Sequence, residues 1–225
     1  MPSYSGVFTL QAQMQAIAAG NWTGIPLVIG QAYQGGYYAG QIGVGGVATH
    51  NLVVGPVASA VSSLQCKNAN TAIPGADSVI DGPQNTADMV ADGNSTVYPA
   101  GHFCNDLVIG GYTDWYMPAK NELEVCYYNL KPTTDANNTS SGINANAVPA
   151  RASNYTSGTP AQTTAVSFQT GNAEAYAISP GGGSYWSSTE KLSTNQWTQD
   201  FQNGNQYGDP KTGSYRVRAI RRVAV

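Results

Sequence analysis

The sequence predicts an α+β domain with short, mostly antiparallel strands, two main helices and long polar loops. Residues 100–107 and 123–130 repeat apolar side chains at helical spacing, and strand-like segments lie on both sides of them. Helices and strands are thus grouped along the chain rather than alternating, which favours α+β over a parallel α/β fold. The 26 glycines among 225 residues fit closely spaced turns.

The N-terminal part is predicted to contain a short helix and three strands. Thr9 can cap apolar residues at helical spacing between 10 and 18, and Gly20 can end that turn. The strand candidates are residues 25–30, 35–42 and 52–57, which glycine-rich turns separate. We expect residues 1–24 to form an attachment segment and residues 25–225 to form the main domain.

The helices are predicted in the middle of the chain. Residues 64–97 are mostly loop, with a short helix at 86–91, and Pro99 suits the start of a helix that Gly110 and Gly111 would end. The clearest helix follows Pro118 and stops before Pro132. Residues 133–183 form a polar insertion too long for an ordinary connection. It is either a loop-built functional face or a segment that packs through hydrogen bonds.

The last part returns to strands, at residues 185–190, 196–201 and 215–223. In the second of these, Trp197 shares one face with Gln199 and Phe201, while Thr198, Asp200 and Gln202 share the other. We expect three tryptophans to be core residues, namely Trp115, Trp186 and Trp197.

Charge is sparse and unevenly placed. The net charge of −3 argues against a binder of nucleic-acid backbones. The first 66 residues contain no Asp, Glu, Lys or Arg, which favours an interface there. Half of the ten basic residues lie at positions 211–222, either as a cationic patch or as arginines that tie down a terminal strand. We favour the second interpretation. Asp114 is expected to cap a turn, and Glu122 to occupy a first helical turn.

The three cysteines indicate neither a disulfide framework nor a metal site, because their number is odd and no Cys-x-x-Cys occurs. Cys104 and Cys126 are predicted to be small buried hydrophobes. The start of the chain lacks a signal-peptide pattern, and no apolar run reaches the roughly 18 residues of a membrane span. We therefore expect no membrane insertion.

Two motifs resemble a bacterial and phage branch of the C-type lectin fold. Residues 110–123 are similar to its Gly-Tyr-x-Asp-Trp-x-x-Pro-x-x-x-Glu-Leu motif. The run Tyr-Trp-Ser-Ser-Thr-Glu at 185–190, followed by Trp197 and Phe201, resembles its C-terminal strands. Residues 28–42 are also similar to a stretch common in phage tail proteins. The resemblance extends over residues 100–225 and implies a C-type-lectin-like fold.

The resemblance also implies a function without catalysis. It points to a tail-fibre or tail-tip protein of a phage or prophage, made in the bacterial cytoplasm and carried in the virion. Such a protein would bind a host-cell surface receptor, either protein or glycan, and contact other tail proteins. Members of this branch include proteins diversified by retroelements that mutate adenines in a C-terminal cassette. The matching positions, rich in the small polar residues and tyrosine typical of paratopes, are Ser193, Asn195, Thr198, Asp200, Gln202, Asn205, Tyr207, Asp209, Thr212, Ser214 and Tyr215. Gln202 departs from this pattern, because adenine changes in an Asn codon do not produce Gln.

Three alternatives stay open. The chain could be a structural tail component that binds no receptor. A formylglycine-generating-type enzyme is disfavoured, because it needs paired reactive cysteines in the C-terminal part and none follows Cys126. A calcium-dependent lectin is disfavoured, because the Glu-Pro-Asn and Gln-Pro-Asp signatures are missing. We therefore expect no cofactor, metal or nucleic acid, and a homo-oligomer, with a trimer favoured, formed through the uncharged N-terminal part.

Overall fold

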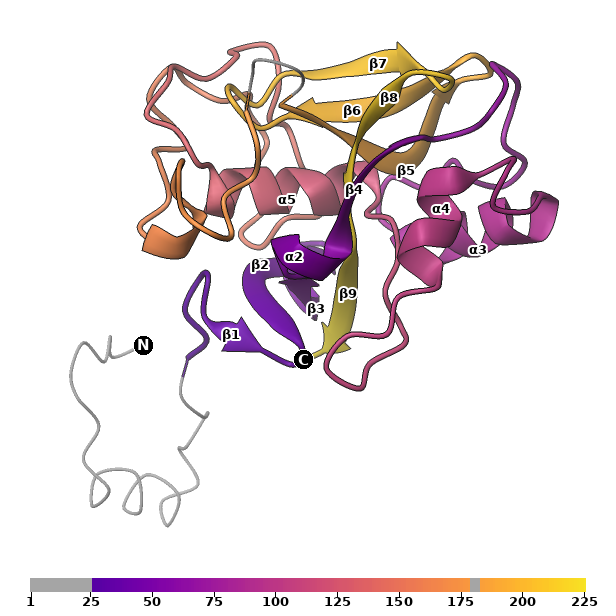
Figure 1. The fold of residues 1–225 in the computed structure, drawn as a ribbon. Helices are drawn as coiled ribbons and strands as arrows, with labels where there is room; N and C mark the ends of the chain where they lie inside the picture. Colours follow the sequence, from indigo (N-terminus) through magenta and orange to yellow (C-terminus); the bar gives the residue numbers. More distant parts are fainter. Residues whose placement is uncertain (1–25, 179–182) are drawn as a thin grey trace.

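One helix lies between two β-sheets. The computed structural model describes residues 26–178 and 183–225. In Figure 1, helix α5 (Lys120–Leu130) runs beneath the sheet that contains β5–β8 and above the sheet that contains β2, β3 and β9. The strand orders are β1-β2-β3-β9 and β4-β8-β5-β6-β7. The helix predicted at 10–18 and the attachment segment predicted at 1–24 lie outside the described residues.

The lower sheet is built on a long antiparallel hairpin of β2 (Gly36–Val44) and β3 (Val47–Val54). Gly45 and Gly46 form its turn. Both have positive φ, as both central residues of a type I′ hairpin turn must. The predictions of strands at 35–42 and 52–57 are confirmed in part. The prediction at 25–30 is wrong over its described part, because residues 26–28 have no regular structure and 29–30 form a turn before the short β1 (Ala32–Tyr33).

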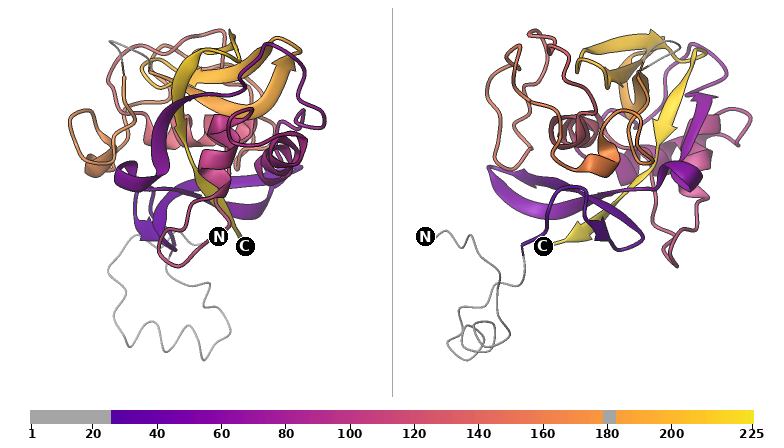
Figure 2. Two further views of the ribbon diagram at one scale, coloured as in Figure 1. Left: turned by 45° about the vertical axis from the view of Figure 1, so that its right-hand side comes forward. Right: turned by 60° about the vertical axis from the view of Figure 1, so that its left-hand side comes forward.

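The upper sheet contains two strands that the sequence did not predict. The predicted ones are β5 (Ser184–Leu192) and β6 (Asn195–Asp200), and the additional ones are β4 (Val61–Gln65) and the edge strand β7 (Gln206–Pro210). The single strand predicted at 215–223 is instead two, β8 (Ser214–Arg218) and β9 (Ile220–Ala224), which belong to different sheets. Figure 2 shows this yellow run passing from the upper sheet to the lower one.

The predicted helices are present, with different limits. Helix α3 (Gly82–Asp92) begins four residues earlier than predicted, where the Asp81 side chain accepts a hydrogen bond from the Gln84 amide (3.3 Å). Helix α4 (Pro99–Asn105) starts at its proline as expected but ends well before Gly110. Short helical turns also occur at α2 (Val57–Ala60) and η1 (Val166–Phe168).

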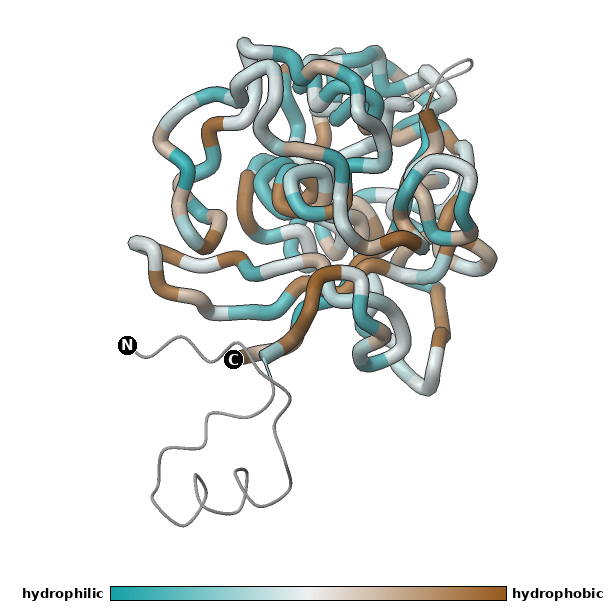
Figure 3. The backbone as a smooth tube through the Cα atoms, turned by 90° about the vertical axis from the view of Figure 1, so that its left-hand side faces the viewer, coloured by the Kyte–Doolittle hydropathy of each residue, from teal (hydrophilic) through white to brown (hydrophobic). Residues whose placement is uncertain are grey.

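The core has two parts. One surrounds α5, where Leu123, Tyr127 and Leu130 pack between the sheets, and the other lies under α3 and α4, around Trp115 and Trp186. Both tryptophans are buried as predicted. All three cysteines are buried and free, which confirms the prediction for Cys104 and Cys126. In Figure 3 most of the chain over the upper half is hydrophilic or neutral in colour, and a hydrophobic stretch follows directly after the grey N-terminal trace, before β1.

The polar insertion packs through hydrogen bonds, which was the second of its two predicted interpretations. Its described part, residues 133–178, contains no strand and attaches to α5 by side-chain contacts. The Tyr127 hydroxyl donates to Asn137 Oδ1 (2.6 Å). The buried Glu124 carboxylate forms an ion pair with Arg151 and accepts hydrogen bonds from Asn144 Nδ2 (2.5 Å) and the Tyr155 hydroxyl (2.7 Å).

Candidate binding surface

All eleven predicted binding positions lie in the upper sheet, on β6, β7 and β8 or in the turns next to these strands. Thr198 of β6 is directly opposite Tyr207 of β7, and Asp209 follows on the same face two residues later. This face points away from α5, because Tyr185 and Gln199, which alternate with it, lie on the α5 side of the sheet. The structure therefore brings Thr198, Tyr207 and Asp209 together.

A hydrogen-bond network connects these residues to β5 and β8. The Asp209 carboxylate accepts from Thr198 Oγ1 (2.8 Å) and from the Tyr215 hydroxyl (2.9 Å). The Tyr207 hydroxyl and Ser184 Oγ are 2.6 Å apart. We call these five residues the tyrosine face. Ser184 was not among the predicted positions; it directly precedes the 185–190 motif and alternates with the inward-facing Tyr185.

Burial divides the tyrosine face into two kinds of residue. Thr198 is 2% exposed and Asp209 is 9% exposed, whereas Tyr207 and Tyr215 are half-buried. The two tyrosine rings can therefore touch a ligand directly, and the two polar side chains hold them from below. The ring of Tyr215 also packs edge-on against buried Trp186, with centroids 4.8 Å apart. Ligand binding by these residues stays a prediction.

The environment keeps both phenols protonated at neutral pH. Burial raises the pKa of Tyr215 to about 12, and the carboxylate of Asp209 adds to this shift. Burial also raises the pKa of Tyr207. Both hydroxyls therefore stay neutral hydrogen-bonding groups, and in the structure Tyr215 uses its proton to bind Asp209.

The other predicted positions surround the tyrosine face or lie away from it. Asp200 accepts a hydrogen bond from the Gln202 amide (2.7 Å), and the Gln202 side chain reaches Asp135 of the insertion (3.0 Å). Asn195 alternates with Gln196 and Thr198 and so shares the opposite face with Trp197. The remaining positions are in turns or near strand ends, and are Ser193, Asn205, Thr212 and Ser214.

Buried Lys211 joins the turns at one end of this surface. Its ammonium group forms an ion pair with Glu190 (2.6 Å) and donates to the carbonyl oxygens of Thr71 (2.8 Å) and Ser193 (2.7 Å). Because the side chain is fully buried, this contact is structural. It connects the β5–β6 turn to the segment that precedes β8.

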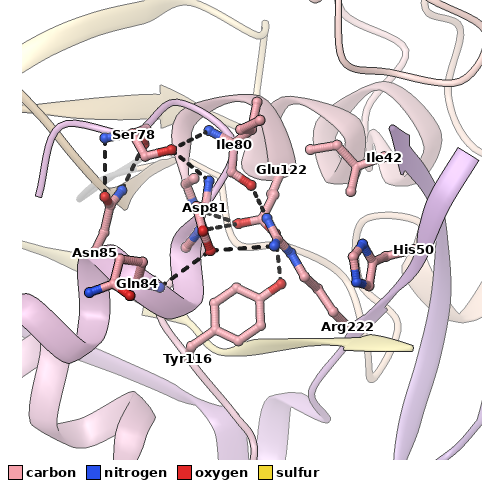
Figure 4. Close-up of polar contacts among 12 residues, drawn as sticks. Ile42, His50, Ser78, Ile80, Asp81, Gln84, Asn85, Tyr116, Glu122 and Arg222 are labelled. Atoms are coloured by element: carbon pink, nitrogen blue, oxygen red, sulfur yellow. Dashed lines mark hydrogen bonds and ion pairs between the residues drawn. The ribbon is translucent and has the colours of Figure 1, made fainter. Parts of the chain in front are cut away.

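The C-terminal basic cluster is structural, as favoured from the sequence. Figure 4 shows Arg222 donating to Glu122 (2.6 Å) and Asp81 (3.4 Å), while the Tyr116 hydroxyl also donates to Glu122 (2.6 Å). Burial raises the pKa of the Glu122 carboxyl, and the charge of Arg222 opposes that shift. Glu122 also accepts from the Ala119 amide (2.8 Å), as expected in a first helical turn.

Two neighbouring arginines are bound in the same way. Arg218 forms an ion pair with Glu174 (2.8 Å), and Arg221 forms one with Asp114 (2.7 Å). Asp114 was predicted to cap a turn. Its carboxylate instead accepts two hydrogen bonds from Arg221, so it anchors β9.

Trp197 is not the core residue that the sequence predicted. Its side chain is only partly buried, and two ammonium groups lie over its ring, with Lys191 Nζ 4.3 Å and Lys120 Nζ 5.0 Å from the centroid. Trp197 and Phe201 share the apolar face predicted for β6, so both were expected in the core. Phe201 packs in the core around α5, whereas Trp197, nearer the start of the strand, lies outside it.

Neither a metal centre nor a membrane span is found in the described part of the chain. No group of three or more His, Cys, Asp or Glu side chains there is arranged to hold a metal ion. No helix within residues 26–178 and 183–225 is long and apolar enough to cross a membrane.

The comparison with protein families identifies the family of this chain. Residues 65–221, more than two thirds of the chain, match the model of the Lcl C-terminal domain. The chain belongs to this family. The match includes both motif segments and all of the tyrosine face, so this surface is part of the Lcl C-terminal domain.

Other comparisons add little to the family assignment. No curated protein matches the chain. A fimbrial protein from Bacteroides ovatus ATCC 8483, solved by crystallography, is similar to this Lcl-family chain, with 15% identity and a TM-score of 0.43. The similarity covers 76% of this chain and 35% of the fimbrial protein, so the chain spans about a third of that protein's length.

Proposed function

We propose that this Lcl-family chain is the receptor-binding part of a phage or prophage tail fibre or tail tip, and that it binds a host-cell surface receptor through the tyrosine face. The family assignment and the motifs similar to the C-type-lectin-like branch support a binding domain. The observation that carries the proposal is that both tyrosine rings are held by buried polar side chains: Asp209, itself bound by Thr198, accepts from the Tyr215 hydroxyl, and Ser184 bonds to the Tyr207 hydroxyl.

Fixed aromatic rings suit recognition. Tyrosine offers a large contact area with few torsions to immobilise, and holding the ring in place beforehand lowers the entropic cost of binding. The surrounding Gln202, Asn205, Thr212 and Ser214 are on turns or a strand end, where exchange of side chains leaves the sheet pairing intact. In this proposal they are the variable rim that sets receptor identity, and retroelement diversification would act there.

The proposal includes a C-type-lectin-like fold, assembly into a homo-oligomer, with a trimer favoured, and attachment to other tail proteins in the virion. The uncharged first 66 residues support a contact at that end of the molecule. Three valines near the hairpin tip and the C-terminal strand are strongly exposed, namely Val44, Val47 and Val225. Light scattering on the purified chain tests this part, and a monomer at all concentrations contradicts it.

Adsorption of the purified chain to a panel of bacterial strains tests receptor binding. The variant Tyr207→Ala/Tyr215→Ala should lose roughly 30-fold or more in affinity for the strain that binds best, because central aromatic residues dominate interface energy. Thr139→Ala, an exposed change in the insertion, serves as the control and should bind normally. Undiminished adsorption of the double variant rules out the tyrosine face.

A structural tail component that binds no receptor is the second candidate. The uncharged N-terminal part favours it, and failure of the wild-type chain to bind any strain of the panel would support it. The neighbouring DNA offers an independent test of the first candidate. A near-copy of the C-terminal cassette that differs at adenines, beside a reverse-transcriptase gene, is expected if the rim is diversified.

A further inference from the structure

A second surface lies on the opposite side of the upper sheet, around Trp197. Side chains alternate along β6, so Trp197 points away from the face that carries Thr198. Lys191, near the end of β5, and Lys120, the first residue of α5, both place their ammonium groups over the indole ring. We call these three residues the lysine–tryptophan platform.

Both lysines lack an acidic partner. Across the described residues, the contacts of the Lys120 and Lys191 ammonium groups are with the ring of Trp197, and neither group forms a hydrogen bond or an ion pair. The residues outside the described ranges contain no Asp or Glu that could supply one. Glu124 lies one helical turn after Lys120, but its carboxylate is bound by Arg151, Asn144 and Tyr155.

Burial and the position at the start of α5 both disfavour the positive charge of Lys120. Lys120 is in the first turn of α5, where the helix dipole disfavours a positive charge. Burial lowers the pKa of Lys120, the charge of Glu124 opposes that shift, and the charge of Lys191 adds to it as the smallest of the three effects. The contrast with Arg218, Arg221 and Arg222 is clear, because each of those has a carboxylate partner.

The backbone leaves room for the platform. Gly208 of β7 is directly opposite Trp197, and a Cβ atom built at Gly208 would be 2.4 Å from Lys191 Cδ. The aliphatic part of Lys191 therefore lies against Gly208 of β7, and a larger residue at position 208 would displace it. The Trp197 indole forms cation–π contacts with both ammonium groups. It is therefore not free to stack on a sugar ring.

We propose that the lysine–tryptophan platform is a docking site for an acidic segment of a partner protein, whose Asp or Glu carboxylates bind between Lys120 and Lys191. The two unpaired charges supply the complementarity, and the half-buried indole supplies an apolar base that lowers the local dielectric. The site is independent of the tyrosine face, because the two lie on opposite sides of β6.

Fluorescence anisotropy with a labelled, capped hexaglutamate peptide tests the proposal. The full chain should bind the peptide, and the affinity should fall as salt is raised from low to physiological concentration. Lys120→Met/Lys191→Met should weaken binding about tenfold or more, because both ammonium groups are lost. Lys191→Arg should bind nearly as well as the wild type, since it keeps the charge.

Two further variants distinguish this site from general charge attraction and from the tyrosine face. Gly208→Ala keeps every charge but displaces Lys191, so it should weaken peptide binding while the melting temperature changes little. Tyr207→Ala/Tyr215→Ala should bind the peptide normally even if it loses cell adsorption. Equal peptide binding by the wild type and the Lys120→Met/Lys191→Met variant overturns the proposal. Binding of a sulfated polysaccharide but not of the peptide also overturns it.

Discussion

At the scale of single residues, the few charges of this chain act mainly as internal cross-links. Arg218 and Lys211 are fully buried, and each joins segments that are distant in sequence through an ion pair and carbonyl contacts. The composition shows that charged residues are scarce, but it does not show that they form buried ion pairs. The pairing itself carries no sequence signal, because Glu174 lies far along the chain from Arg218, and the motif that contains Glu190 does not name Lys211 as its partner.

The pair of Glu124 and Arg151 gives a prediction at this scale. Glu124→Gln should lower the free energy of unfolding by about 3 kcal/mol, because it leaves the mostly buried Arg151 without its counter-charge. Urea denaturation followed by circular dichroism measures this change. Asp114→Asn is the matched control. Its carboxylate is half-exposed, so breaking its pair with Arg221 should cost no more than about 1 kcal/mol. Equal losses in the two variants would contradict the prediction.

At the scale of elements, helices were easier to predict than strands. Periodicity and proline positions located α4 and α5, because each begins at or shortly after a proline and repeats apolar residues at helical spacing, although α5 is buried on nearly every side. Strand β7 was missed because Gly208 and Pro210 break the usual strand pattern, which an edge strand tolerates. The run 215–223 looked continuous, yet it changes sheets at Ala219, where its pairing partner changes from β4 to β3.

The connection between β6 and β7 gives a prediction at this scale. Gly204 has a φ of +77°, and an added Cβ would be 2.3 Å from the ring of Tyr127. Gly204→Ala should therefore cost about 3 kcal/mol, from backbone strain and overpacking together. Gly46→Ala, at a φ of +79° with nothing nearby, isolates the strain and should cost about 1 kcal/mol. Thermal denaturation compares the two, and an equal loss would show that Tyr127 moves aside easily.

At the scale of the whole molecule, the motifs located the binding surface but not its internal organisation. They placed all eleven candidate positions in the upper sheet. They could not show that Asp209 of β7 would reach Tyr215 of β8, because these strands are separated by β5 and β6 in the sheet. The motifs also could not predict the partial exposure of Trp197, because this exposure depends on where α5 begins relative to β6.

The shared run of β8 and β9 predicts that the two sheets unfold together. Ile220 follows directly from the upper sheet through Ala219 and exchanges two backbone hydrogen bonds with Tyr116, at 2.9 and 3.0 Å. Because β8 of the upper sheet continues directly into β9 of the lower sheet, unfolding of one sheet should release a strand of the other. Near-ultraviolet and far-ultraviolet circular dichroism should report one coincident thermal transition. Two separated transitions would show that the sheets are independent.

The buried cysteines have a practical consequence. Burial raises the pKa of Cys66 and of Cys126 to about 12 and that of Cys104 further still, so these thiols are shielded and protonated at neutral pH. Maleimide reagents will accordingly modify them slowly in the native chain. A cysteine introduced at exposed Thr139, the control position outside the tyrosine face, could then carry a single fluorophore, and a microscope would reveal where on a bacterial cell the chain attaches.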